Sequence, residues 1–87
     1  LIALVSCPQG KGQEIGRVLL ESGLAACVNL LSGVRSIYLW KGKIEDDSEE
    51  LLLAKTHADR WTEFENKVKE IHPYELPEII HIKIEGG

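Results

Sequence analysis

Val-Arg-Ser-Ile-Tyr-Leu-Trp-Lys-Gly-Lys-Ile, residues 34–44, is the most informative stretch of this 87-residue chain. Its β-branched and aromatic side chains favour a strand, and Lys41-Gly42-Lys43 is typical of a tight reversal. A second apolar run, Leu51-Leu52-Leu53-Ala54, follows an acidic stretch. We therefore predict one long antiparallel hairpin over residues 26–56, with a bend or bulge at Gly33 in its first arm.

The segment before the hairpin predicts a strand followed by a helix. Residues 1–5 are almost all apolar, as in a strand that is covered or central in a sheet. From Gln13 onward, apolar side chains recur at helical spacing, and Gly23 is a typical helix stop.

The segment after the hairpin repeats this pattern in reverse. Asp59 is placed to cap a second helix, which Pro73 ends. The apolar stripe of this helix is Trp61, Phe64, Val68 and Ile71. Three isoleucines then alternate with polar residues, which predicts a strand with one buried face: Ile80, Ile82 and Ile84.

The element order is therefore strand, helix, strand, strand, helix, strand. Each helix is a right-handed crossover that returns parallel, and the hairpin makes the second and third strands antiparallel. We place the third strand between the first and second, and the fourth strand beyond the first. This is the ferredoxin-like βαββαβ arrangement, an α+β fold with an antiparallel four-stranded sheet and both helices on one face. At this length, residues 1–87 form a single domain.

The hairpin is too long for the rest of the domain. Arms of about 14 residues would extend about 45 Å at ~3.3 Å per residue, whereas strands of ordinary length extend ~20 Å. The part that extends beyond the sheet carries Ile37, Tyr38, Leu39 and Trp40, which are costly to leave in water. We expect another copy of the chain to cover them.

Composition excludes several classes of partner. The net charge of −4 and the isoelectric point near 5.3 disfavour nucleic acid. No apolar run reaches the roughly 18 residues of a membrane span, and no leader with a cleavage site is present. We expect a cytoplasmic protein. Because the chain starts at Leu1 and lacks Met, we expect it to be a trimmed form of a longer protein.

Four ordered motifs together resemble the CutA family, the divalent-cation tolerance proteins. They are Ala25-Ala26-Cys27-Val28-Asn29, residues 36–44, Leu53-Ala54-Lys55-Thr56 and residues 72–80, His-Pro-Tyr-Glu-Leu-Pro-Glu-Ile-Ile. The resemblance implies a ferredoxin-like fold and a tight homotrimer similar to the PII signalling proteins. Family members normally continue into a C-terminal helix with aromatic residues, which we expect to be absent here.

The connection at residues 72–78 is the best candidate metal site. Two prolines restrict it, and imidazole, carboxylate and a nearby thiolate suit copper or zinc. The resemblance implies copper binding, with His72 and Cys7 matching the proposed ligand region of the family. The predicted ligands are Cys7, His72, Glu75 and Glu78. The alternative is that the prolines shape a turn and His72 caps a helix end.

A cleft between subunits is the second candidate site. Its predicted residues are Tyr38, Trp40, Lys55 and Tyr74. Lys55 could bind an anion there or simply extend from a strand edge into solvent. The acidic run at residues 45–50 lacks the pattern of a calcium loop, so we interpret it as a solvated hairpin surface.

Catalytic motifs are missing from the chain. No serine lies in a GxSxG context, and the three histidines have no evident acid partner. We therefore expect a non-enzyme with no required cofactor. The leading hypothesis is a CutA-like homotrimer that binds divalent metal, copper above others, in metal tolerance. The alternatives are a PII-like sensor of a small molecule or anion, and a structural trimer that anchors a partner protein.

Overall fold

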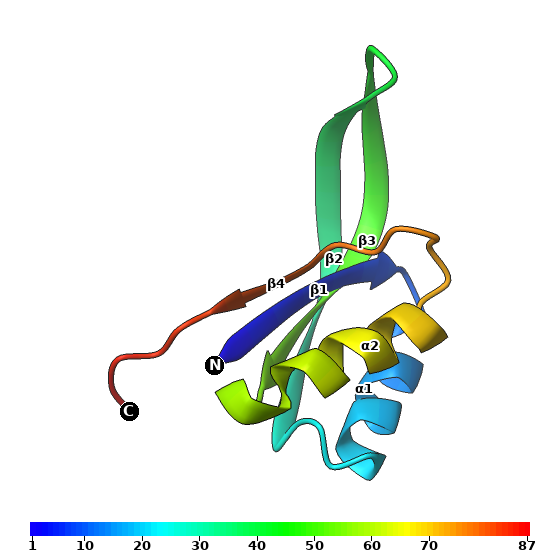
Figure 1. The fold of residues 1–87 in the computed structure, drawn as a ribbon. Helices are drawn as coiled ribbons and strands as arrows, with labels where there is room; N and C mark the ends of the chain where they lie inside the picture. The colour runs from blue at the N-terminus through cyan, green and yellow to red at the C-terminus, as the bar shows by residue number, and fades with distance from the viewer.

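Two helices cover one face of a four-stranded antiparallel sheet in the computed structural model of residues 1–87 (Figure 1). A short 3-10 helix, Ala58–Arg60, precedes the second helix. The strands and helices are β1 Ile2–Pro8, α1 Gly12–Glu21, β2 Cys27–Trp40, β3 Lys43–Lys55, α2 Trp61–Ile71 and β4 Ile79–Ile82. The strand order β2-β3-β1-β4 confirms the ferredoxin-like α+β arrangement.

The long hairpin is confirmed, including both irregularities predicted for it. The β2–β3 ladder is interrupted between Leu31 and Val34, where Gly33 has a φ of 71°. At the tip, Lys41 and Gly42 both have positive φ values, as a two-residue hairpin turn with the twist of the strands requires.

Most of the hairpin extends beyond the sheet. β1 pairs with β3 only as far as the partners Pro8 and Glu49. Residues 34–48, which we call the hairpin arm, therefore stand beyond the edge of β1 and have no helix beneath them (Figure 1). This is the length mismatch predicted from the sequence.

The core lies between the sheet and the two helices. Its largest fully buried side chains are Phe64, Leu19, Leu52, Val5 and Val68. Helix α1 ends at Glu21 and is followed by Gly23, whose φ is 70°. The N–H of Leu24 donates to the carbonyl of Leu19 at 2.9 Å. This Schellman-type end turns the chain back toward β2.

Two details of the second half differ from the sequence-based expectation. Asp59 does not cap α2: it lies in the 3-10 helix, and the helix N-cap is Arg60, without a side-chain cap bond. The last strand is short, and the isoleucine face predicted to be buried is about half exposed: Ile80, Ile82 and Ile84. Ile79 and His81 point toward the helices instead, with the His81 ring 4.4 Å from Trp61.

These isoleucines belong to an apolar sheet face that the helices leave uncovered. In the register, Leu4 of β1 lies between Leu53 of β3 and Ile80 of β4. Ile2 and Ile82 form the next pair on the same face. No helix of the chain is long and apolar enough to cross a membrane.

Candidate functional site

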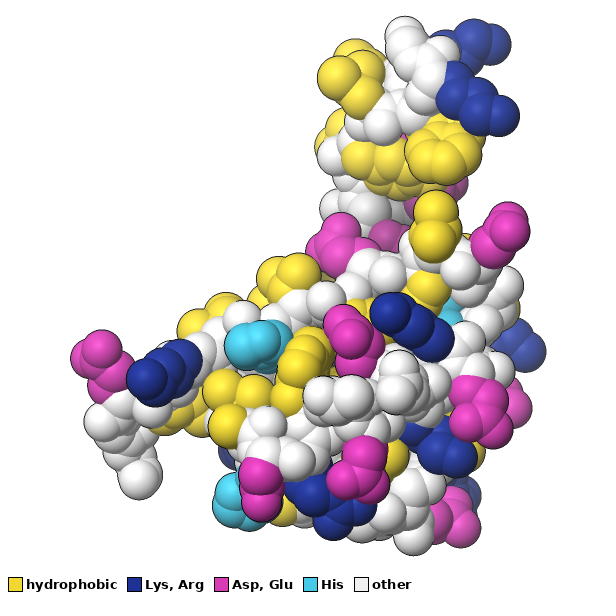
Figure 2. Space-filling view, viewed as in Figure 1, with side chains coloured by type: hydrophobic (Ala, Val, Ile, Leu, Met, Phe, Trp, Pro, Cys, Tyr) yellow, Lys and Arg dark blue, Asp and Glu magenta, His cyan; other side chains and the backbone are white.

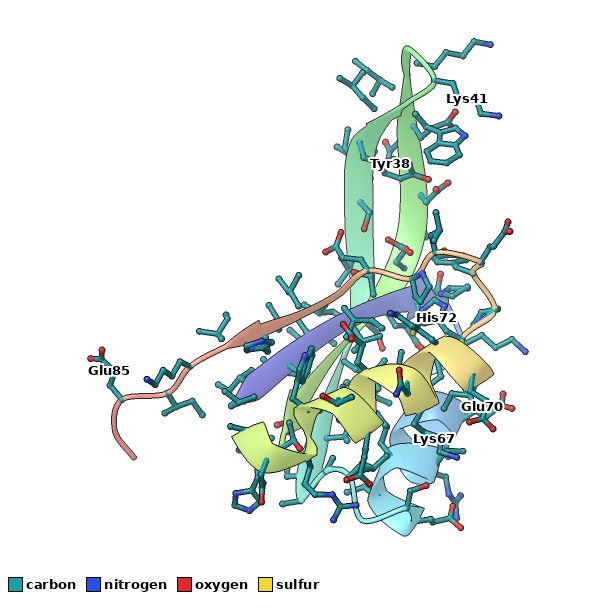
Figure 3. All side chains as sticks on the ribbon, viewed as in Figure 1. Tyr38, Lys41, Lys67, Glu70, His72 and Glu85 are labelled. Carbon is teal, nitrogen blue, oxygen red and sulfur yellow. The ribbon has the colours of Figure 1, made fainter.

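A cavity of about 920 Å³ lies where the hairpin arm meets the loop between α2 and β4 (Figure 3). We call it the acidic pocket because four glutamates and no lysine or arginine are among its twelve lining residues. The lining side chains used below are Tyr38, Trp40 and Glu45 from the arm, Glu49 of β3 at the base of the arm, and Tyr74, Glu75 and Glu78 from the loop.

The tight turn of the hairpin sets the arm side of this pocket. A two-residue turn fixes the pairing register, which places Tyr38 directly opposite Glu45. Side chains two residues apart share one face of a strand, so Trp40 and Glu49 lie on the same side as this pair. Pro73 restricts the loop that closes the other side of the pocket.

Two tyrosine–carboxylate hydrogen bonds order the pocket walls. The Tyr38 hydroxyl donates to Asp47, and this bond is the main reason its pKa rises to about 12. The Tyr74 hydroxyl donates to Oε2 of Glu49 at 2.9 Å. Burial, followed by this bond, raises the pKa of Tyr74 to about 12. Both hydroxyls therefore stay protonated at neutral pH and act as donors.

His72 connects the loop to β1. Its side chain is buried, and Nε2 lies 2.7 Å from the carbonyl oxygen of Ser6 (Figure 3). The backbone N–H of Tyr74 donates to Nδ1 at 3.0 Å. Because a carbonyl only accepts and an N–H only donates, the ring is neutral with its hydrogen on Nε2. In this arrangement His72 has no lone pair left for a metal ion.

The predicted metal ligands do not meet within one chain. Cys7 is fully buried on the helix-covered face, and burial, then the charges of Glu50 and Glu49, raises the pKa of its thiol to about 11. A thiol of this kind stays protonated, whereas metals bind the thiolate. No group of three or more His, Cys, Asp or Glu side chains in the chain is placed to hold a metal ion.

Three of the four predicted cleft residues do come together. Tyr38, Trp40 and Tyr74 all line the acidic pocket. Lys55 does not: it is exposed at the opposite end of β3, beside Ile2. At ~3.3 Å per residue it lies about 30 Å along the strand from the partner of Tyr38. Lys55 therefore adds no positive charge to the pocket of its own chain.

Sequence reasoning missed the inward-facing members of the acidic run. Glu49 is buried rather than solvated, and Oε1 of Glu50 accepts the backbone N–H of Gly12 at 2.8 Å. The position of Glu45 could have been predicted from the sequence. A two-residue turn at Lys41 and Gly42 pairs Trp40 with Lys43, and counting outward from that pair places Glu45 opposite Tyr38. The contact between Glu49 and Tyr74 depends on a loop 25 residues further along the chain.

A sequence profile of the CutA1 divalent ion tolerance protein family matches residues 1–87. The chain belongs to this family. The CutA protein of Homo sapiens is 46% identical over 86 residues, which cover 98% of this chain and 48% of the human protein. The divalent-cation tolerance protein CutA of Thermus thermophilus is 39% identical, over 99% of this chain and 84% of that protein.

Solved structures of CutA proteins share the fold. The Thermus thermophilus structure has a TM-score of 0.95 at 39% identity and covers 99% of this chain and 84% of its own. The Nostoc sp. PCC 7120 structure, described as a PII-like protein CutA, has a TM-score of 0.91 at 39% identity, over 97% of this chain and 80% of its own. The chain spans about half the length of the human relative. The Thermus thermophilus relative is named a divalent-cation tolerance protein, and neither relative's name states a reaction.

Proposed function

We propose that this CutA1-family chain assembles as a homotrimer and binds divalent cations in the acidic pocket where its arms meet neighbouring copies. The observation that carries the proposal is the pocket itself, which combines four carboxylates with three aromatic side chains and contains no cationic side chain. Its charge favours a cation and disfavours an anion. The rival hypothesis of an anion sensor therefore finds no support in this pocket.

The need for assembly follows from exposed apolar surface. On the hairpin arm, Leu39 and Ile44 are 73% and 75% exposed, and Trp40 is 56% exposed. The uncovered sheet face adds a second apolar surface. At about 25 cal/mol per Å² of apolar surface, covering both surfaces favours association. A closed ring of three copies covers both kinds of surface, as the family resemblance implies.

The cation site is proposed for the assembly and not for the isolated chain. One chain brings no three ligands together, so neighbouring copies complete the set. Oxygen donors replace the thiolate and imidazole expected from the sequence. Among first-row divalent ions such a site binds copper most tightly. Carboxylates accept a metal only when ionised, so protons compete with the metal and binding weakens in acid.

Calorimetric titration of the assembled protein with Cu²⁺, Zn²⁺ and Mg²⁺ tests this proposal. Glu45→Gln removes one pocket carboxylate and is expected to weaken Cu²⁺ binding at least tenfold while the trimer persists. Glu21→Gln, an exposed change on α1 outside the pocket, is the matched control and leaves the affinity unchanged. Equal affinities in wild type and both variants would exclude the pocket as the cation site.

The cellular setting forms part of the same proposal. We place a non-enzymatic protein in the cytoplasm, acting in divalent-cation tolerance. The rice relative is named chloroplastic, so family members differ in location. Fractionation of cells that express the full-length protein tests this assignment, which is contradicted by recovery from an organelle or the periplasm.

A further inference from the structure

We infer that the acidic pocket also binds an aliphatic polyammonium ion, a small organic cation that carries several amine charges. The inference rests on the proposed function in one respect, because both place a cation in this pocket. Metal binding alone leaves the aromatic walls of the pocket without a role, since divalent ions take oxygen, nitrogen or sulfur ligands from proteins. An organic cation uses the carboxylates and the aromatic rings together.

The size and the aromatic lining of the pocket suit an organic ligand. Its volume of about 920 Å³ lies within the range of ~300–1,000 Å³ that is usual for pockets that enclose small molecules. Tyr38, Trp40 and Tyr74 line it, and aromatic ring faces attract an ammonium group that lies within ~6 Å of the ring centre. The chain itself shows such a contact, because Nζ of Lys41 lies 5.7 Å from the centre of the Trp40 ring.

Glu49 brings to the pocket a buried charge that has no cationic partner in the chain. It is only 7% exposed, and its Oε2 accepts the hydroxyl of Tyr74. Its Oε1 accepts no hydrogen bond, and the residue belongs to no ion pair. A carboxylate so far withdrawn from water is stabilised by a charged donor. An ammonium group is such a donor, with three N–H bonds to offer.

The number and spacing of the carboxylates favour a ligand with more than one charge. Figure 2 shows acidic side chains next to hydrophobic ones at the base of the hairpin arm. No ion pair of the chain includes any of the four glutamates that line the pocket, Glu45, Glu49, Glu75 and Glu78. Glu45 and Glu49 are about 13 Å apart along β3 at ~3.3 Å per residue. A linear polyamine reaches carboxylates spaced in this way, with its methylene stem against the aromatic rings as a lysine stem lies on apolar surface.

Calorimetric titration of the assembled protein with spermidine, which has three amines, tests the inference. We expect saturable binding, and n-butylamine, which has a single amine, should bind at least tenfold more weakly. Glu45→Gln should weaken spermidine binding at least fivefold, because it removes one pocket charge. Glu21→Gln, an exposed change outside the pocket, is the control and leaves the affinity unchanged. Equal affinities in Glu45→Gln and Glu21→Gln would overturn the inference.

Variants of Tyr74 test the contribution of the aromatic walls. Tyr74→Leu removes one ring and no carboxylate, and it is expected to weaken spermidine binding at least fivefold. Tyr74→Phe restores the ring without the hydroxyl and should recover most of that loss. Circular dichroism and sedimentation of both variants confirm that the compared chains are folded and assembled. Spermidine affinities that are equal in the Leu and Phe variants would contradict an organic cation held against the rings.

Separate titrations with Cu²⁺ and with spermidine distinguish this inference from the proposed function. Binding of Cu²⁺ without binding of spermidine contradicts the inference alone. Binding of spermidine without binding of Cu²⁺ supports the inference and contradicts the metal site. If neither ligand binds, both are overturned.

Discussion

His72 links β1 to the loop that closes the acidic pocket: its Nε2 donates to the carbonyl of Ser6, and its Nδ1 accepts from the N–H of Tyr74. We predict that His72→Ala lowers the free energy of unfolding by about 2–4 kcal/mol, because it leaves the Ser6 carbonyl and the Tyr74 N–H without partners. Urea denaturation at one fixed protein concentration measures the change. His57→Ala, at an exposed position, is the control, and equal losses in the two variants would refute the bridging role.

Cys7 couples stability to alkaline pH. Its thiol pKa is raised from 9.0 to about 11 in the folded chain, so folding favours the protonated form. The resulting stabilisation is complete below pH 9 and is lost as pH rises through about 11. It amounts to about 2–3 kcal/mol. Cys7→Ala removes this component, so the difference in unfolding free energy between wild type and variant should narrow between pH 8.5 and 11. A constant difference would contradict the assignment.

For individual side chains, the sequence predicted location near the loop better than it predicted chemical role. Tyr38, Trp40 and Tyr74 were predicted to line a cleft between subunits, and all three line the acidic pocket of a single chain. The state of His72 was not predictable, because it depends on the backbone of Ser6, 66 residues away. The same holds for Cys7, whose environment is set by the packing of α1.

Among the secondary-structure elements, helix α1 begins at Gly12, a position with no room for a larger side chain. A Cβ atom added to Gly12 would lie 2.7 Å from Oε1 of Glu50 and from a methyl carbon of Leu30. Gly12→Ala should therefore cost roughly 1–3 kcal/mol of unfolding free energy through overpacking. At Gly86 an added Cβ meets nothing within 4 Å, so Gly86→Ala should stay within about 0.5 kcal/mol of wild type. The melting temperatures of the two variants measure the difference, and equal stabilities of Gly12→Ala and Gly86→Ala would contradict the close packing at Gly12.

Local sequence signals predicted the hairpin, its bulge at Gly33 and the stop at Gly23, because each depends on a few neighbouring residues. Two predictions failed where a local pattern does not specify its surroundings. Alternation at Ile80 and Ile82 correctly indicated a strand, but it does not say which sheet face the helices cover. Asp59 has the chemistry of a helix cap, yet the chain first makes a 3-10 turn there.

For the whole molecule, the two tryptophans separate assembly from folding. Trp61 stacks on Phe64 at 5.3 Å within the core of one chain, whereas Trp40 lies exposed on the hairpin arm. Trp40→Ala should weaken assembly at least tenfold while each chain still folds. Trp61→Ala should instead lower the stability of the folded chain by roughly 3 kcal/mol. Dilution series and melting curves for both variants measure the two effects, and the reverse pattern would contradict the packing.

The proposed function depends most on the oligomeric state of the chain. The apolar arm, the uncovered sheet face and the acidic pocket each lack a partner in a single chain, and a ring of copies supplies one to all three. Sedimentation equilibrium at micromolar concentration measures this directly. From a chain mass of 9.7 kDa, we predict a single species of three chains with a mass of about 29 kDa. A folded species of 9.7 kDa at that concentration would contradict it.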